Sequence, residues 1–322
     1  MIAFLLEARA IRCLPPAPRR EYPDFVSDDA SVVMLPGRGS PDGASGEDVV
    51  MQVYEARAGS FRGRSVLTKN ALSLVMQGHK TMYFAARTVQ AGSDEVHLLS
   101  AGNCVASMEL GGRGPFQSIL IYFDTGVHEA FAAKYDALIR SARAHTTALA
   151  DPYISFRKDA FIHGYISSLH SLLQSGRPLS ADMKRLKLEE ILLHLLESQP
   201  EKFLAFRPQI SRDLSDLDVR RAVEVSLTSS LSIDELAFLC KCSPSTFKRR
   251  FMRIYGLAPI TWIRQRRMEL AADLLGRRGT RPSEVFHQIG FETHSSFSQA
   301  FKSAFGLTPR EYQLRRLSFP RQ

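Results

Sequence analysis

The pattern of apolar and polar positions divides the chain into a front part with strand-like spacing and a back part with helical spacing. Between about Ser31 and Asp124, short apolar runs such as SVVML, ALSLVMQG and SILIYF alternate with turn-forming residues. Runs of this length and spacing are typical of a β-sandwich or a small β-barrel. After Thr125, apolar residues recur at the spacing that lines one face of a helix.

The clearest helical segment of the front half runs from Ser180 to Ser198. Ser180 is suited to cap this helix, and five apolar residues fall on one of its faces. These residues are Leu188, Ile191, Leu192, Leu195 and Leu196. A stripe of this kind fits either packing against the protein's own β-domain or a dimer seam. We take it as the expected dimerisation surface and keep packing as the open alternative.

A repeat of fifty residues occupies the last third of the chain. The segment STFKRRFMRIYGLAPI, from Ser245, matches the segment SSFSQAFKSAFGLTPR, from Ser295. The matched pairs are Ser245 and Ser295, Phe247 and Phe297, Phe251 and Phe301, Gly256 and Gly306, Leu257 and Leu307, and Pro259 and Pro309. Self-similarity of this kind indicates one supersecondary unit that is used twice.

The first copy predicts a helix-turn-helix. Ser232 can cap a short helix, and after a turn at Lys241 and Cys242, Ser243 and Pro244 can start a second helix. Outward on the second helix we expect Ser245, Thr246, Lys248, Arg249, Arg250, Met252 and Arg253. Such a face suits a major groove, because arginine and lysine can donate to guanine O6 and N7 and to phosphates.

The second copy repeats this plan with a helix from His294 to Phe305. Its expected core face is Phe297, Phe301 and Phe305. Its expected outward residues are His294, Ser295, Ser298, Gln299 and Lys302. Because this face is polar with a single obvious phosphate partner, Lys302, we expect fewer phosphate contacts and weaker base readout from it.

A helix that starts at Pro259 is expected to join the two copies. About eighteen residues at 1.5 Å rise make a strut of roughly 27 Å. Successive major grooves on one face of DNA lie about 34 Å apart. The two outward faces could therefore read successive grooves from a single chain.

Charge and cysteine content agree with this interpretation. The net charge of the 322 residues is +9, and the segment from Asp218 to Gln322 alone holds 18 Lys and Arg against nine Asp and Glu. All of the excess positive charge is thus in the back part, which indicates a polyanionic partner. The four cysteines form neither a metal-binding set nor the framework of a secreted module, so we expect a cytoplasmic protein. We expect neither a signal peptide nor a membrane span.

Enzymatic alternatives find little support in the residues. A cupin-type metal site needs closely spaced histidines with a carboxylate, and the candidates His79, His97, Glu109 and His128 are scattered. A DNA-repair methyl acceptor would need a thiolate cluster that Cys13 and Cys104 cannot supply. We expect no catalytic residue, no metal and no cofactor.

The stretch from Ser232 to Arg316 resembles the double helix-turn-helix domain of the AraC/XylS family of bacterial transcription regulators. The resemblance lies in DELAFLCKCSPSTFKRRF, in the GLAP after it, and above all in IGFETHSSFSQAFKSAFGLTPREYQ. By motif position it implies base reading by Ser245, Lys248, Arg249, His294, Ser295, Ser298 and Gln299, and phosphate contacts by Arg250 and Lys302. The chain departs from the family pattern at Phe286, where alanine is usual, and at Lys241, where glycine or asparagine is usual.

The front half resembles, more weakly, the cupin-like regulatory domain of the subgroup that includes activators of type III secretion. That resemblance implies self-association and binding of a partner protein, whereas other relatives bind a small molecule. The sequence leaves both possibilities open. Lys69, His79, Tyr83 and Arg87 lie in the candidate barrel and could line a ligand site.

Together these observations predict an α+β protein with a cupin-like β-barrel, a helical dimerisation region and a C-terminal all-α double helix-turn-helix domain. The expected boundaries are 1–30 for a leader, 31–126 for the β-domain, 127–217 for the helical region and linker, and 218–322 for the reader. The expected function is a sequence-specific transcription regulator, an activator, with promoter DNA, RNA polymerase and a second copy as partners. The alternative is an interaction protein that binds DNA without sequence preference.

Overall fold

The computed structural model describes residues 32–36, 47–56, 60–109, 115–143, 151–208, 216–277 and 280–318. The expected leader, Cys13 and most of the expected linker near residue 210 lie outside these ranges.

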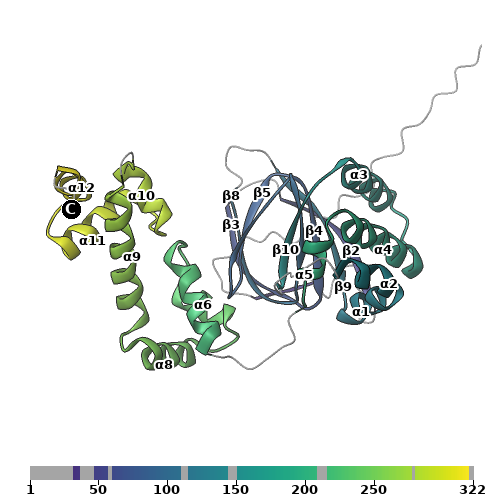
Figure 1. Ribbon diagram of the computed structural model, residues 1–322, viewed down its shortest axis with the longest axis horizontal. Coiled ribbons are helices and arrows are strands. Elements are labelled where there is room, and N and C mark those ends of the chain that lie inside the picture. Colours follow the sequence, from purple (N-terminus) through teal and green to yellow (C-terminus); the bar gives the residue numbers. More distant parts are fainter. Residues whose placement is uncertain are drawn as a thin grey trace, which may run out of the picture.

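The front part of the chain contains two five-stranded sheets that face each other, as Figure 1 shows. One sheet has the strand order β1-β3-β8-β5-β6 and the other has the order β10-β7-β4-β9-β2. The strands are β1 (Val33–Leu35), β2 (Val49–Ala56), β3 (Ser60–Leu67), β4 (Asn70–Gln77), β5 (His79–Tyr83), β6 (Thr88–Gly92), β7 (Glu95–Leu99), β8 (Gly102–Glu109), β9 (Phe116–Phe123) and β10 (Tyr153–Arg157). The expected barrel-like β-domain is thus present.

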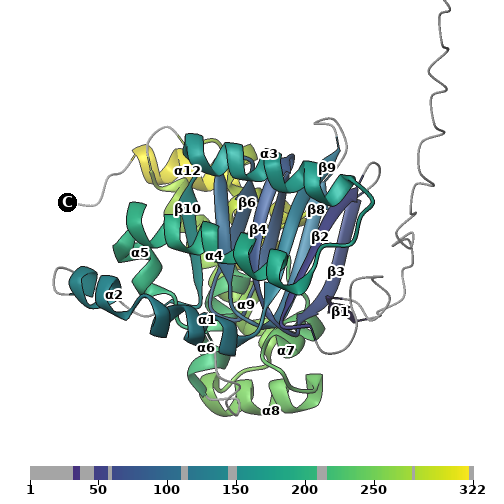
Figure 2. The ribbon, with the colours of Figure 1, turned by 90° about the vertical axis from the view of Figure 1, so that its right-hand side faces the viewer.

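Alternation along the central strands builds two cores. In β9, Phe116 and Tyr122 face the opposite sheet, whereas Ile119 and Ile121 belong to the core beneath the helices. Successive side chains of a strand point to opposite faces of its sheet, so this sheet is buried on both sides. Figure 2 shows helices α3 and α4 in front of it.

Five helices follow β9 and cover this sheet, and the strand β10 lies between the second and the third of them. They are α1 (Thr125–Lys134), α2 (Asp136–Arg143), α3 (Ala160–Gln174), α4 (Ala181–Ser198) and α5 (Pro200–Ala205). The strand β10 pairs with β7 in an antiparallel ladder from Tyr153 to Arg157. The sequence pattern did not predict this strand, and the expected helical region shares one core with the β-domain.

The five apolar residues of α4 do not form a free surface. Leu188, Ile191, Leu192, Leu195 and Leu196 are each at most 1% exposed and lie in the core that contains the sheet. The expectation that they form a dimer seam is therefore corrected in favour of the packing alternative. Burial of such side chains in the protein's own core removes apolar surface from water without a partner chain.

The back part of the described chain is helical. Its helices are α6 (Asp216–Leu227), α7 (Ile233–Leu239), α8 (Pro244–Tyr255), α9 (Pro259–Leu275), α10 (Pro282–Gln288), α11 (His294–Phe305) and α12 (Pro309–Ser318). The expected α+β fold class is confirmed. Within the described residues, no helix combines the length and the apolar character that crossing a membrane requires.

Candidate nucleic-acid interface

Local hydrogen bonds start and end the helices of the first helix-turn-helix as the sequence predicts. At α7, the Ser232 hydroxyl accepts from the Glu235 amide at 3.2 Å and the Glu235 carboxylate accepts from the Ser232 amide at 2.7 Å, which is a capping box. At α8, the Ser243 hydroxyl accepts from the Thr246 amide at 3.2 Å. Gly256 ends α8 in the left-handed conformation, with φ of 72°.

The apolar face of α8 is buried and fixes which residues face outward. Phe247 and Phe251 are fully buried in the core shared by α6, α7 and α9. The outward side chains include three of the predicted base-contacting residues, Ser245, Lys248 and Arg249, all exposed. This helix therefore presents a cationic face to solvent, a feature suited to phosphates and to guanine edges.

The other two basic residues of α8 are more engaged. Arg253 is exposed but donates to the carboxylate of Asp216 at the start of α6. Arg250 is half-buried. Burial raises the pKa of the Cys242 thiol beside the turn, and the charge of Arg250 partly offsets that rise. Binding of a phosphate by Arg253 would have to compete with Asp216. We therefore expect Arg253 to contribute less to DNA binding than Lys248 or Arg249.

The second recognition helix, α11, has the same frame and a different face. The Thr293 hydroxyl caps it by accepting from the Ser296 amide at 3.2 Å, and Gly306 ends it with φ of 71°. Phe297 and Phe301 are fully buried, as expected. The predicted contact residues His294, Ser295, Gln299 and Lys302 are exposed, and Ser298 is half-buried.

Two aromatic residues of the second unit are partly exposed, and one of them, Phe305, differs from the sequence expectation. Phe305 is 36% exposed and packs at the edge of the core, with its ring 4.6 Å from that of Phe301 and 5.3 Å from that of Tyr312. It is therefore not a full core residue, because the core stops one turn earlier. Phe286 lies half-buried with its ring edge-on to His294 at 5.7 Å. The larger side chain thus packs against the start of α11.

A single helix connects the two units. α9 has 17 residues, which corresponds to roughly 26 Å at 1.5 Å rise. Figure 1 shows α8 across the lower end of the upright α9, with α11 beside its upper part. Ile263 of α9 belongs to the first core, whereas Met268 and Leu275 belong to the second, so both cores share this helix.

The turn of the first unit carries backbone strain. Lys241 has φ of 56° and stands as the one non-glycine residue with positive φ in the described chain. A side chain in this region costs about 1 kcal/mol, which explains the usual glycine or asparagine at this place. Lys241 is exposed, so its side chain meets no steric barrier beyond this local cost.

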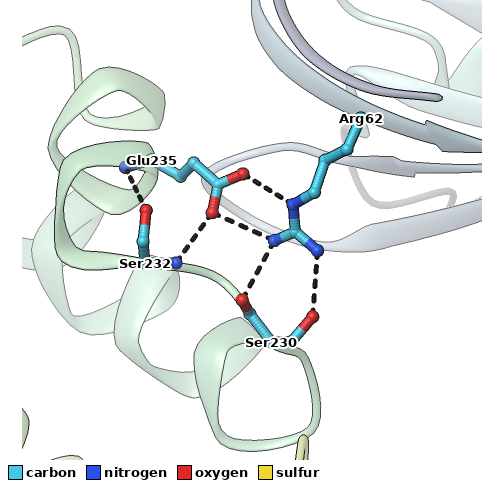
Figure 3. Close-up of polar contacts among 4 residues, drawn as sticks. All are labelled: Arg62, Ser230, Ser232 and Glu235. Carbon is cyan, nitrogen blue, oxygen red and sulfur yellow. Dashed lines mark hydrogen bonds and ion pairs between the residues drawn. The ribbon is translucent and has the colours of Figure 1, made fainter. Parts of the chain in front are cut away.

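The first unit also docks onto the β-domain through one arginine, drawn in Figure 3. From β3, Arg62 Nε donates to Glu235 Oε1 at 2.7 Å and Nη2 donates to Glu235 Oε2 at 3.0 Å. The same guanidinium donates to the hydroxyl of Ser230 at 2.9 Å and to its carbonyl at 3.0 Å. Paired parallel bonds of this kind fix orientation as well as distance.

Apolar contact extends this interdomain junction. Val105 of β8 is fully buried in the core cluster of the first unit, and the Asn103 side chain donates to the Phe238 carbonyl at 2.6 Å. Sequence patterns did not single out these residues or Arg62. The only signal was the spacing of Ser232 and Glu235, which is that of a capping box.

The four residues that were candidates for an inner ligand site are not brought together. Lys69 and His79 stand at opposite ends of β4, and Lys69 pairs with Asp124. Arg87 pairs with Asp151, and Tyr83 packs toward the first helix-turn-helix unit. They do not converge on one site, so this expectation is corrected.

Two buried titratable groups of the β-domain, Cys104 and His97, are held in their neutral forms. Burial raises the pKa of the Cys104 thiol to about 12, which leaves it protonated and a poor nucleophile. Burial, with the charges of Lys80 and Lys158 adding to it, lowers the pKa of His97 to about 4. Both groups are packed away from solvent rather than placed on an open surface.

A regulatory β-domain joined to two helix-turn-helix units on one connecting helix defines the class of two-domain DNA-binding regulators. A family described as "ExsA N-terminal regulatory domain" matches residues 70–206, and one described as "Helix-turn-helix domain" matches residues 236–315. Both matches agree with the resemblance of the chain to the AraC/XylS family of bacterial transcription regulators.

Several bacterial proteins are similar to this chain. The virulence regulon transcriptional activator VirF of Yersinia enterocolitica is 22% identical over 252 residues, which cover 78% of this chain and 91% of VirF. The HTH-type transcriptional regulator ExsA of Pseudomonas aeruginosa is 27% identical over 165 residues, 48% of this chain and 55% of ExsA. Among solved structures, ToxT from Vibrio cholerae is 13% identical with a TM-score of 0.35, and the match covers 83% of this chain and 98% of ToxT.

Proposed function

We propose that this protein is a sequence-specific transcription activator that reads two successive major grooves with α8 and α11. The observation that carries the proposal is the pair of capped helices, each with a buried phenylalanine face and an exposed polar face, joined by α9. Exposed side chains at the start of such helices are placed to reach base edges. Relatives that are named as activators support the sign of regulation.

The two units divide the contacts. In α8, Ser245, Lys248 and Arg249 contact bases, while Arg250 and Arg253 contact phosphates. In α11, Lys302 contacts a phosphate, and the base contacts come from His294, Ser295, Ser298 and Gln299. Neither unit needs a catalytic group, a metal or a cofactor for this work.

The protein acts in the cytoplasm, on promoter DNA, together with RNA polymerase and as a homodimer. Its dimer seam lies outside the five buried residues of α4, because these are occupied by the protein's own core. The β-domain receives the regulatory signal, from a small molecule or from a partner protein, and passes it on through the junction of Arg62, Ser230 and Glu235.

Binding measurements test this function against the alternative of DNA binding without sequence preference. A site is selected from random duplex DNA with the purified full chain, and its affinity is compared with that of a scrambled duplex over a series of salt concentrations. A specific regulator binds its site at least about a thousandfold more tightly than scrambled DNA. Equal affinities that fall together with salt would support the alternative and overturn the proposal.

A further inference from the structure

One arginine in the middle of α9 touches both helix-turn-helix units. Arg267 Nη2 donates to the carbonyl oxygen of Ser226 at 2.6 Å and to that of Ser229 at 2.5 Å. Its Nη1 donates to the carbonyl oxygen of Gly290 at 3.2 Å. We call Arg267 with these three carbonyls the Arg267 clamp.

The carbonyls of the Arg267 clamp come from two different units. Ser226 lies in the last turn of α6, and Ser229 lies in the loop that leads to Ser232 and the start of α7. Gly290 lies in the turn between α10 and α11, three residues before the cap of α11 at Thr293. The clamp therefore ties together the loop that enters the first unit's helix pair and the turn that enters the second recognition helix.

The side chain of Arg267 is half-buried, and main-chain carbonyls accept its hydrogen bonds. Burial lowers the pKa of its guanidinium, and its Nε has no hydrogen-bond partner among the described residues. The guanidinium also lies 5.9 Å from the centre of the Phe291 ring. Among the described residues, carbonyl dipoles and one aromatic ring hold this cationic side chain, and no carboxylate offsets its desolvation cost, which suggests a geometric role.

Direct contact between the two segments reinforces the clamp. Gly290 has φ of 72°, and a Cβ at this position would lie 2.5 Å from the Ser229 carbonyl oxygen. The second turn therefore approaches the loop of the first unit as closely as a glycine permits. Backbone meets backbone at this point, so the relative position of the units is fixed without a flexible side chain between them.

We propose that Arg267 is a positioning residue that sets the offset between α8 and α11 and thereby the spacing of half-sites that the protein accepts on DNA. The proposal rests on the proposed function, since it assumes that both helices read one site. Two binding modules that are held rigidly gain affinity only when the sites match their separation. Inserting one base pair moves the second half-site by about 3.4 Å along the axis and rotates it around the duplex.

The test compares DNA duplexes that differ only in spacing. From the selected site, duplexes are made with one base pair added or removed between the half-sites, together with one in which the second half-site is scrambled. Affinities of the full chain and of Arg267→Met are measured for each. Methionine keeps an unbranched apolar stem and removes all three hydrogen bonds.

We expect the wild-type chain to lose about tenfold or more in affinity for each change of spacing. Arg267→Met should bind the natural spacing about tenfold more weakly, differ by no more than about threefold among spacings, and match wild type on the scrambled second half-site. Arg267→Lys, which keeps the charge but not the planar fork, should give an intermediate profile. The matched control Arg264→Met changes an exposed arginine of the same helix and should keep the wild-type spacing profile.

The outcomes separate the two proposals. If the wild-type chain shows no spacing preference, bipartite reading itself fails. If the wild-type chain shows one and Arg267→Met retains it, Arg267 does not position the units. If Arg267→Met weakens binding to every duplex by one common factor, Arg267 acts through stability alone, and the positioning role is overturned.

Discussion

The two helix-turn-helix units have nearly the same frame and different chemistry. Both recognition helices are capped by a hydroxyl, bury two phenylalanines and end at a glycine with φ near 70°. The first presents a row of basic side chains, whereas the second presents Lys302 among neutral polar groups. Caps and core thus preserve the geometry of the repeat, while the exposed face is free to differ, so affinity and base choice can be divided between the units.

The units also differ in what surrounds them. The first unit has a strained lysine at its left-handed turn position and docks onto the β-domain through Glu235. The second unit has Gly290 there, and this turn is packed against the first unit. In the second unit this left-handed conformation therefore requires glycine, because a Cβ would clash with Ser229. In the first unit a side chain is tolerated at a local conformational cost.

The largest effect should come from Gly290→Ala. The new Cβ would combine an unfavourable φ with a position 2.5 Å from the Ser229 carbonyl, so we expect the free energy of unfolding to fall by about 3 kcal/mol. Chemical denaturation of the full chain measures it. The matched control is Gly306→Ala, where φ is 71° and no atom lies within 4 Å, with an expected cost of about 1 kcal/mol. Equal losses would show that packing at Gly290 is unimportant.

The next effect distinguishes the two recognition faces. Arg249→Ala should weaken binding to the selected site by about 2 kcal/mol and relax its base preference, because a base-edge donor is lost. Lys302→Ala should weaken binding to all sequences alike and lower the salt slope by about one, because a phosphate contact is lost. Titrations on cognate and scrambled duplexes at several salt concentrations measure both. Identical losses on both duplexes for the two variants would contradict this division of labour.

A smaller effect is expected at the junction of Arg62 with Ser230 and Glu235. Burial tends to raise the pKa of the Glu235 carboxyl, but the bonds from Arg62 and from the Ser232 amide outweigh it, so this pKa lies below its ordinary value of 4.5. The carboxylate therefore stabilises the fold at neutral pH, and this contribution is lost as the pH falls below about 4.5 toward the lowered pKa.

Glu235→Gln keeps an acceptor for the capping box and removes the charge. We expect it to lower the free energy of unfolding by about 1 kcal/mol at pH 7, with the difference from wild type shrinking as the pH falls below about 4.5. The control Asp234→Asn removes a neighbouring exposed carboxylate and should change stability much less. A difference that stayed constant over this pH range would argue against the charged pair.

The smallest effect should have the opposite sign. Lys241→Gly relieves the strain at φ of 56° but gives the unfolded chain more freedom, so we expect a net gain of about 0.5 kcal/mol. Thermal unfolding measures the gain. A loss of stability would mean that the lysine side chain makes a contact worth more than the strain.

Sequence patterns predicted the features that depend on near neighbours. The caps at Ser232 and Ser243 and the ends of the recognition helices follow from residues within four positions of each other. Strand β10 was missed because its place is set by pairing with β7, across more than fifty residues. The role of the α4 stripe was ambiguous because an apolar face looks the same against a sheet as against a partner.

The junction and the Arg267 clamp were beyond the sequence pattern for a related reason. Arg62 and Glu235 are separated by 173 positions, and Arg267 binds main-chain carbonyls, which every residue has. Such contacts leave no periodicity and no characteristic spacing. The candidate base contacts, by contrast, were found because the repeat placed them on a helix whose buried side was already known.

Glu235 accepts hydrogen bonds from two neighbours, Arg62 and the Ser232 amide, so a regulatory signal could break one contact and leave the other. If Arg62 withdraws, the mutual bonds of Glu235 and Ser232 remain, so α7 keeps its first turn intact. Water can take over the vacated carboxylate positions at this partly open edge. The contact between Arg62 and Glu235 can therefore break without unfolding the first turn of α7, and the helix-turn-helix unit stays folded when this contact is lost.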